Sequence, residues 1–112
     1  MLGIEYPIIQ GGMQWLSRAE FVAAVSNAGA LGILTAATHE TKEALKKEIQ
    51  KTRSLTNNPF AVNLAFYIRT PEKTNENIDV IIEEGITVVE TATRSPEAFI
   101  DKLKNANIKV IH

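Results

Sequence analysis

The sequence predicts an α/β fold with a parallel sheet, because short apolar runs alternate with longer amphipathic stretches. Five such runs begin twenty to thirty residues apart in this chain of 112 residues. That spacing leaves room for a crossover helix between neighbouring strands, which parallel pairing requires. The content of 45% hydrophobic and 22% charged residues is that of an ordinary globular domain. We therefore expect one domain over residues 1–112.

The predicted strands are the five apolar runs, residues 8–10, 31–35, 60–64, 87–89 and 108–111. The first helix between them is predicted from a capping box, in which the Ser17 and Glu20 side chains each accept a hydrogen bond from the other residue's backbone N–H. Leu16 and Phe21 occupy the positions of a hydrophobic staple across that helix start. Gly29 is expected to end the helix, since glycine adopts the left-handed backbone of a C-cap without strain.

The next two helices have similar signals. One begins near Thr41 and buries Leu45 and Ile49, which are four residues apart and so share a face. The other is expected over residues 75–84, ended by Gly85, with three isoleucines turned inward: Ile78, Ile81 and Ile82. The longest connection, residues 65–73, follows the third strand and is expected at the ligand-binding end of the sheet.

In the fourth helix Ser95 is the predicted cap and Pro96 the first helical residue, where its missing N–H costs nothing. Phe99 and Leu103 are then expected to face the sheet. The chain thus holds four βα units and a fifth strand, about half of a (β/α)8 barrel of ~250 residues. A half-barrel leaves two strand edges and one sheet face unpaired, so we expect either a longer parent chain or a homo-oligomer.

Charge and composition exclude several classes of function. Twelve Lys and Arg stand against thirteen Asp and Glu, and a net charge of -1 offers no basic surface for nucleic acid or an anionic membrane. The absence of cysteine excludes thiolate catalysis, disulfides and cysteine-based metal sites, and it fits a cytoplasmic location. The N-terminus lacks the basic and apolar segments of a signal peptide, and no apolar window approaches the length of a membrane span.

Two candidate binding segments follow predicted strands. Gly11 and Gly12 come directly after the first strand, where paired glycines permit positive φ and a close approach of the backbone to a planar or phosphorylated ligand. A plain turn is the alternative, and the spacing does not match the Rossmann fingerprint. Asn63, near the end of the third strand, carries a carboxamide that needs a backbone, water or ligand partner when it is buried.

Polar residues also follow the fourth strand, where Glu90, Thr91 and Arg94 arrive together. Glu90 is the candidate base or substrate contact, with an internal ion pair to Arg94 or stabilisation of the helix start as the alternative. His112, on the last strand, is either turned toward a cofactor or a core histidine. With His39 it makes no metal site, because no third ligand stands at metal spacing.

Five segments of the chain together form a recognisable pattern. The first two are GIEYPIIQGGM at residues 3–13 and AAVSNAGALG at residues 23–32. The others are NPFAVNL at residues 58–64, VVETA at residues 88–92 and IKVIH at residues 108–112. In order and spacing, these segments resemble the nitronate monooxygenases, formerly called 2-nitropropane dioxygenases, whose relatives include the FMN-dependent enoyl-ACP reductases. The resemblance therefore spans essentially the whole chain.

The resemblance implies an oxidoreductase, a TIM barrel that holds FMN non-covalently at the carboxyl ends of its strands and oxidises alkyl nitronates with dioxygen. It also implies that the backbone of Gly11, Gly12 and Met13 lies along the flavin ring and that the Asn63 side chain hydrogen-bonds it. The family's phosphate-binding loops and catalytic histidine belong to later strands, so we expect weak or no FMN binding by this chain alone. The alternatives are an enoyl-ACP reductase and a non-catalytic half-barrel that self-associates.

Two positions depart from the family pattern. Residues 13–15 are Met-Gln-Trp where many members continue in glycines, and this difference is expected to reshape the substrate pocket. Thr93 stands where glycine is expected after Glu-Thr-Ala, which leaves the role of Glu90 open.

Overall fold

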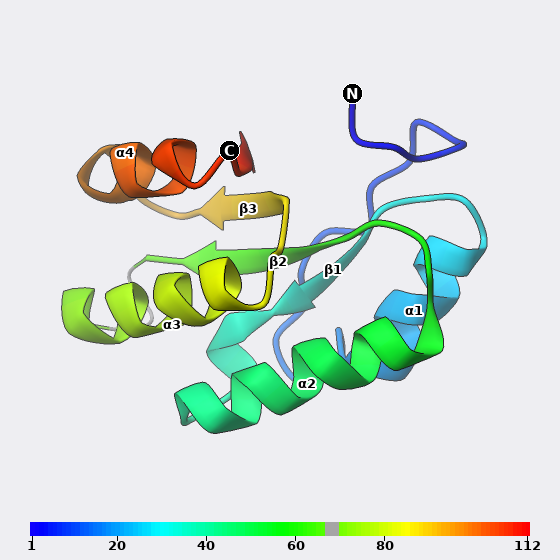
Figure 1. The fold of residues 1–112 in the computed structure, drawn as a ribbon, viewed down its shortest axis with the longest axis horizontal. Helices are drawn as coiled ribbons and strands as arrows, with labels where there is room; N and C mark the ends of the chain where they lie inside the picture. Colours follow the sequence, from blue (N-terminus) through cyan, green and yellow to red (C-terminus); the bar gives the residue numbers. More distant parts are fainter. Residues whose placement is uncertain (67–69) are drawn as a thin grey trace.

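The structure, a computed structural model, describes residues 1–66 and 70–112 and contains a parallel sheet of four strands in the order β1-β2-β3-β4 (Figure 1). The strands are β1 (Gly32–Thr35), β2 (Phe60–Ala65), β3 (Val88–Ala92) and β4 (Lys109–Ile111). The helices are α1 (Ala19–Asn27), α2 (Lys42–Leu55), α3 (Pro71–Glu83) and α4 (Glu97–Asn105), with a short 3-10 helix η1 (Ala36–Thr38) after β1. Each strand pairs with the next one along the chain, and one of α2, α3 and α4 lies in each crossover. The predicted α/β half-barrel is confirmed.

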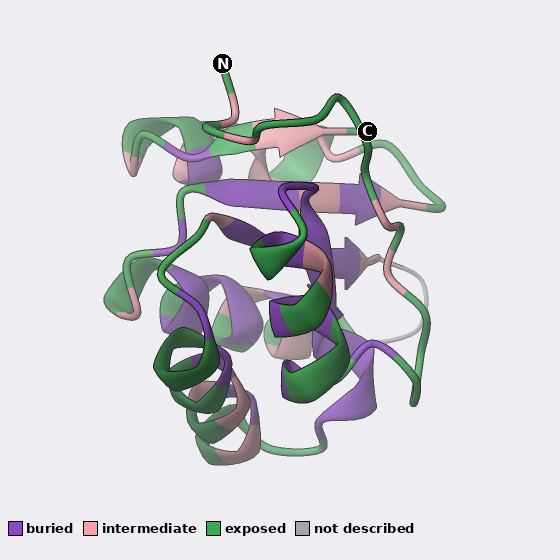
Figure 2. Ribbon diagram, turned by 90° about the vertical axis from the view of Figure 1, so that its right-hand side faces the viewer, coloured by how far each residue is buried: buried purple, intermediate pink, exposed green. Residues whose placement is uncertain are grey.

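The two faces of the sheet differ in what covers them. One face packs against all four helices and forms the main core, to which the strands contribute alternate residues such as Val62, Leu64 and Val89. The opposite face carries a smaller cluster of Leu31, Ile33, Ala61 and Val88, against which Leu2, Ile4 and Ile111 pack. Figure 2 shows the buried residues along the strands and exposed residues on the outer helix surfaces and the N-terminal segment. The face without helices is therefore the one open to a ligand or to more chain.

The first predicted strand, residues 8–10, is wrong in extent. Ile9 alone pairs with Leu31, as an isolated parallel bridge beside β1. The bridge consists of two backbone hydrogen bonds, Leu31 N–H to Ile8 O and Gln10 N–H to Leu31 O, both 2.9 Å. The next backbone donor, the Ile33 N–H, binds the Gln10 side-chain Oε1 at 3.1 Å. Because a side chain takes the place of the next backbone acceptor, the segment does not continue as a strand.

The predicted capping box at the start of α1 is wrong. The helix begins at Ala19, and no capping side chain of its own binds the first turn. Ser17 is buried and hydrogen-bonds within the preceding loop, while Glu20 forms an ion pair with Lys51 of α2. The Glu48 carboxylate of α2 accepts the Ala19 N–H at 2.8 Å. A neighbouring helix thus supplies the acceptor that local sequence was expected to supply.

The predicted hydrophobic staple is wrong as well, because Leu16 and Phe21 are 68% and 43% exposed. The predicted end of α1 is confirmed. Gly29 has φ +94°, and the Ala30 N–H reaches back to the Val25 O at 3.3 Å. This left-handed backbone conformation is one that glycine adopts without strain.

Helix α2 agrees with the prediction. The Thr41 hydroxyl accepts the Ala44 N–H at 3.1 Å as its cap, and Leu45 and Ile49 are fully buried. Within the described part of the chain, no helix combines the length and apolar character that crossing a membrane requires.

Helix α3 begins at Pro71, which is earlier than its predicted start at residue 75. Thr70 caps it by accepting the Lys73 N–H at 3.3 Å, and Pro71 takes the first helical position. This Thr-Pro pair is a helix-start signal that the sequence analysis overlooked. Of the three isoleucines expected inside, two are buried, whereas Ile82 is 36% exposed. The predicted connection 65–73 is shortened accordingly, and its residues 67–69 lie outside the described residues.

Helix α4 begins at Glu97, one residue after its predicted start, with Pro96 at the cap position. The Ser95 hydroxyl accepts the Glu97 N–H at 3.3 Å. Leu103 is fully buried, and Phe99 stacks on Phe66 with ring centroids 5.2 Å apart. The predicted inward face of this helix is confirmed.

Candidate functional site

Three polar side chains form a row across the sheet near the carboxyl ends of the strands. Thr35 pairs in register with Asn63, and Asn63 pairs with Glu90. Side chains alternate between the two faces of a sheet, so these three share the face of Ile33 and Ala61, opposite the helices. We call Thr35, Asn63 and Glu90 the polar row.

The loop that follows Ile9 meets the polar row at Glu90. One carboxylate oxygen of Glu90, Oε2, accepts the Asn63 Nδ2–H at 2.9 Å and the Gly12 N–H at 3.3 Å. Groups that are 27 and 78 residues away from Glu90 in the sequence therefore meet at one atom. The structure brings together three residues that the sequence analysis had singled out separately.

Gly12 permits this approach because it has no side chain. A Cβ at this position would stand 2.7 Å from the Asn63 Cβ and 3.0 Å from the Thr35 Oγ1. A Cβ on Gly11 would stand 3.8 Å from the Glu90 Oε1, which is an ordinary contact. Positive φ, which paired glycines also permit, is found at neither glycine. The requirement for glycine therefore lies at Gly12 and comes from close packing.

The rest of the loop is held by its own hydrogen bonds. The Met13 N–H and the Gln10 Nε2–H both donate to the Ser17 Oγ, each at 2.9 Å. The Trp15 N–H donates to the Thr38 Oγ1 at 3.0 Å. Trp15 itself has φ +71°, in the left-handed region. The Met13 N–H is thus engaged within the loop, and the Met13 side chain is 39% exposed. The roles of Gln10 and Ser17 in bracing the loop were not predicted.

Thr35 is the member of the polar row that the sequence analysis missed. Its Oγ1 is buried and has no hydrogen-bond partner among the residues that the structure describes. A buried hydroxyl costs about 1–3 kcal/mol when nothing satisfies it, so such a group points to a water or a ligand atom. The only signal in the sequence is its place as the last residue of the apolar run 31–35.

The other candidates at the end of β3 and β4 do not join the polar row. The Thr91 Oγ1 lies 2.9 Å from the His112 Nδ1 and donates to the Ile111 O at 3.3 Å. By strand alternation, Thr91 is on the helix side of the sheet, so His112 is turned to that side as well. Among the described residues no ion pair joins Glu90 to Arg94. The row therefore takes only Glu90 from this cluster.

Thr93 has φ +81°, in the left-handed region that glycine adopts freely and a β-branched residue does not. The turn after β3 thus keeps a glycine-type backbone although a threonine occupies it. The left-handed backbone at position 93 is the physical reason why a glycine is expected there.

His39 follows η1 and is 6% exposed. Its Nε2 is buried and has no hydrogen-bond partner within the described ranges. Burial lowers the pKa of the His39 imidazole, the Glu48 carboxylate opposes this shift, and the Arg18 charge adds to it. His39 is therefore a buried group that favours the neutral form.

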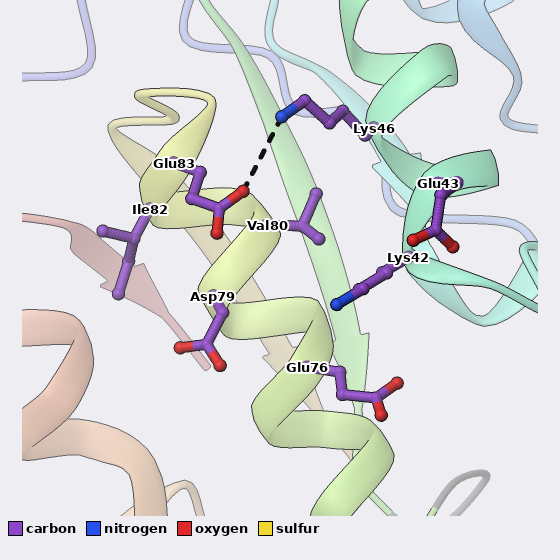
Figure 3. A pocket seen from close by; sticks show the side chains of 8 residues that line it. All are labelled: Lys42, Glu43, Lys46, Glu76, Asp79, Val80, Ile82 and Glu83. Carbon is purple, nitrogen blue, oxygen red and sulfur yellow. Dashed lines mark ion pairs between the residues drawn. The ribbon is translucent and has the colours of Figure 1, made fainter.

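A charged groove lies between α2 and α3 (Figure 3). Lys42, Glu43 and Lys46 line it from α2, and Glu76, Asp79 and Glu83 from α3. The Lys46 Nζ lies 3.7 Å from the Glu83 Oε2, and exposed pairs of this kind contribute little to stability. Because α2 and α3 cover the other face of the sheet, this groove is separate from the polar row.

Comparison with known proteins shows which families and proteins the chain is similar to. The family model described as nitronate monooxygenase matches residues 1–112. A probable nitronate monooxygenase of Staphylococcus saprophyticus is 33% identical over 144 residues, covering 99% of this chain and 40% of that protein. The (3aS,4S,5R,7aS)-5-hydroxy-7a-methyl-1-oxo-octahydro-1H-indene-4-carboxyl-CoA dehydrogenase of Mycobacterium tuberculosis is 36% identical over 111 residues, covering 99% of this chain and 30% of that protein.

Among solved structures, FabK from Thermotoga maritima has a TM-score of 0.88 and 37% sequence identity, covering 97% of this chain and 34% of that one. The chain thus spans between 30% and 40% of the length of these relatives.

Proposed function

The chain belongs to the nitronate monooxygenase family. From that membership we propose that the complete protein, of which this chain is a part, oxidises alkyl nitronates with dioxygen by means of non-covalently bound FMN. The observation that carries the proposal is the approach of the Gly12 backbone to Asn63 and Glu90 at the carboxyl ends of the strands. Parallel α/β proteins bind their ligands at this end of the sheet. Residues 1–112 are then the first part of a flavin-binding TIM-barrel domain.

Gly12 and two residues of the polar row, Asn63 and Thr35, fit the ring of a flavin. Gly12 presents backbone without a side chain, Asn63 a carboxamide, and Thr35 a buried hydroxyl that lacks a partner in the described part of the chain. Such groups suit a planar ligand whose edge carries hydrogen-bond donors and acceptors. In this proposal the backbone of Gly11, Gly12 and Met13 lies along the ring, and the Asn63 side chain hydrogen-bonds it.

The chain's own contribution is to hold and orient the ring. The flavin, when bound, accepts electrons from the substrate and passes them to dioxygen. Gln10 and Ser17 brace the loop that lies along it. Ile33 and Ala61 form an apolar layer beside the polar row on the same face of the sheet. We assign no proton-transfer residue within this chain, and the resemblance places the family's catalytic histidine in later strands.

An absorbance spectrum tests the proposal. The complete protein and the 112-residue chain are each incubated with FMN, desalted and scanned in the visible range, and oxygen uptake is then followed with propionate 3-nitronate. We expect retained flavin and nitronate-dependent oxygen uptake in the complete protein. The chain alone should retain little flavin, because it lacks the phosphate contacts expected in later strands. Retained flavin without nitronate turnover would reject the oxygenase, and a complete protein that retains no flavin would reject the whole proposal.

A second candidate is a flavin-dependent oxidoreductase of thioesters, such as an enoyl-ACP reductase. Two relatives named as CoA dehydrogenases are 36% and 37% identical to the chain over 111 residues. Probable nitronate monooxygenases are 33% identical over 144 residues and 49% identical over 78 residues, so sequence identity does not separate the two candidates. Turnover of NAD(P)H with an enoyl thioester, and none with propionate 3-nitronate, would favour this candidate.

A further inference from the structure

We infer that Glu90 is a positioning residue, whose carboxylate fixes the carboxamide of Asn63 so that Nδ2 faces Glu90 and Oδ1 is the atom that receives a hydrogen bond from the ligand. The ligand class that fits is a planar ring with an N–H donor, such as an imide, and an anionic oxygen at this point is disfavoured. The inference rests on the proposed function for the identity of that ring, but the orientation of Asn63 stands apart from it.

The first step is the chemistry of the contact. A carboxylate has acceptors only, whereas a carboxamide has one donor end and one acceptor end. The two ends of Asn63 are distinguished by what they face, and the Glu90 Oε2 lies 2.9 Å from the Nδ2. Turning the amide over would place Oδ1 against the carboxylate, with two acceptors in contact and no proton between them.

The second step is the rigidity of the arrangement. Asn63 and Glu90 are register partners on adjacent strands, so backbone hydrogen bonds hold their Cα atoms opposite one another. The same Oε2 also accepts the Gly12 N–H at 3.3 Å, which ties the carboxylate to the loop as well. Asn63 is buried and Glu90 is half-buried, so both groups have little freedom to rotate into solvent.

The third step is the consequence for a ligand. One of the two Nδ2 hydrogens of Asn63 goes to Glu90, so the acceptor that this side chain offers a ligand is Oδ1. The negative charge of Glu90 lies beside it and favours a donor hydrogen while disfavouring a second anion. An imide N–H of a flavin ring satisfies both conditions, whereas the oxygens of a nitronate anion do not. A nitronate substrate is therefore expected to bind elsewhere over the ring.

Nuclear magnetic resonance of the cofactor-free complete protein tests the orientation. With isotope-labelled asparagine and glycine, we expect one Asn63 Nδ2 proton to resonate well downfield of the other and to exchange slowly with solvent. In Glu90→Ala this difference should disappear and the Gly12 amide should exchange faster. Asp101→Asn, which removes an exposed carboxylate of α4, should leave both signals unchanged. Two Asn63 protons with ordinary shifts and fast exchange in the unmodified protein would overturn the inference without any variant.

Binding of a modified flavin tests the ligand class. FMN and its N3-methyl analogue, which lacks the imide N–H, are titrated by quenching of flavin fluorescence. We expect the unmodified protein to prefer FMN by about tenfold and Glu90→Gln to reduce that preference to about threefold or less, because a glutamine no longer fixes the Asn63 amide. An equal preference in both proteins would overturn the assignment of Glu90. If the unmodified protein binds neither flavin, the proposed function fails, and the resonance experiment alone decides the role of Glu90.

Discussion

Gly12 lies so close to Asn63 that a Cβ on the glycine would stand 2.7 Å from the Asn63 Cβ. Real Cβ atoms do not approach other atoms to this distance, so the loop and β2 fit together only while position 12 is glycine. The contact joins the first candidate segment of the sequence to the second. It also makes the candidate site sensitive to a single methyl group.

We predict that Gly12→Ala lowers FMN retention by the complete protein by at least about tenfold and lowers the free energy of unfolding by about 1–3 kcal/mol, because the loop must move away from Asn63. Flavin absorbance after desalting and urea denaturation measure the two effects. Gly11→Ala is the matched control for the free energy of unfolding, since its Cβ would make an ordinary contact 3.8 Å from the Glu90 Oε1. An equal loss of stability in the two variants would contradict the packing argument.

Thr93 is predicted to be a strained residue that glycine relieves. At φ +81° a side chain crowds the backbone, so Thr93→Gly is expected to raise the free energy of unfolding by about 0.5–1 kcal/mol. Thr87→Gly, at an exposed position just before β3, should lower the free energy of unfolding instead. A glycine there makes the unfolded chain more flexible and relieves no strain in the folded one. Urea denaturation of both variants checks the signs, and a loss of stability in Thr93→Gly would sink the prediction.

The start of α1 is predicted to depend on a residue of α2. Glu48→Ala removes the acceptor of the Ala19 N–H and should lower the free energy of unfolding by about 1 kcal/mol, the usual cost of losing an N-cap. Glu20→Ala, which removes the acid of the predicted capping box, should change it little because Glu20 only forms an exposed ion pair. Thermal denaturation measures the loss of stability in both variants. A larger loss in Glu20→Ala than in Glu48→Ala would contradict this prediction and support the capping box.

Stability is predicted to fall at acidic pH through His39. The pKa of the folded His39 is lowered by burial, so below the ordinary histidine pKa of about 6.5 the unfolded chain binds a proton that the folded chain resists. Its contribution is therefore fully retained above that pH and is lost as the pH falls toward the folded pKa. The free energy of unfolding from pH 7 to 5 measures it. His39→Leu should flatten this part of the profile, and an unchanged profile in that variant would contradict the prediction.

The 112-residue chain alone is predicted to self-associate through the edge beside β1. Ile8 and Ile9 are 60% and 45% exposed there, and among residues 1–66 and 70–112 a single bridge pairs this segment with the sheet. Light scattering over a range of concentrations should show a dimer that Ile9→Lys dissociates. Leu55→Lys, at a 44% exposed residue ending α2, is the control and should leave the dimer intact. A monomeric mass for the folded, unmodified chain would reject the prediction.

Several features could be predicted from the sequence because they depend on neighbouring residues. The alternation of apolar runs and amphipathic stretches predicted the parallel α/β order, and the Thr41 cap and the Gly29 helix end followed from local backbone chemistry. The start of α3 is equally local, since Thr70 and Pro71 signal it, although the prediction placed that start at residue 75. Gly12, Asn63 and Glu90 were also found from the sequence, as separate candidates at the ends of strands.

What only the tertiary structure decided depends on contacts between distant segments. The acceptor at the start of α1 comes from Glu48 on another helix, and the first strand ends where the Gln10 side chain takes a backbone donor of β1. The register of β2 with β3 sets Asn63 opposite Glu90, and the loop then brings Gly12 to the same carboxylate. Sequence spacing along one strand cannot specify such meetings, because they require the three-dimensional register of strands and the space that a missing Cβ leaves.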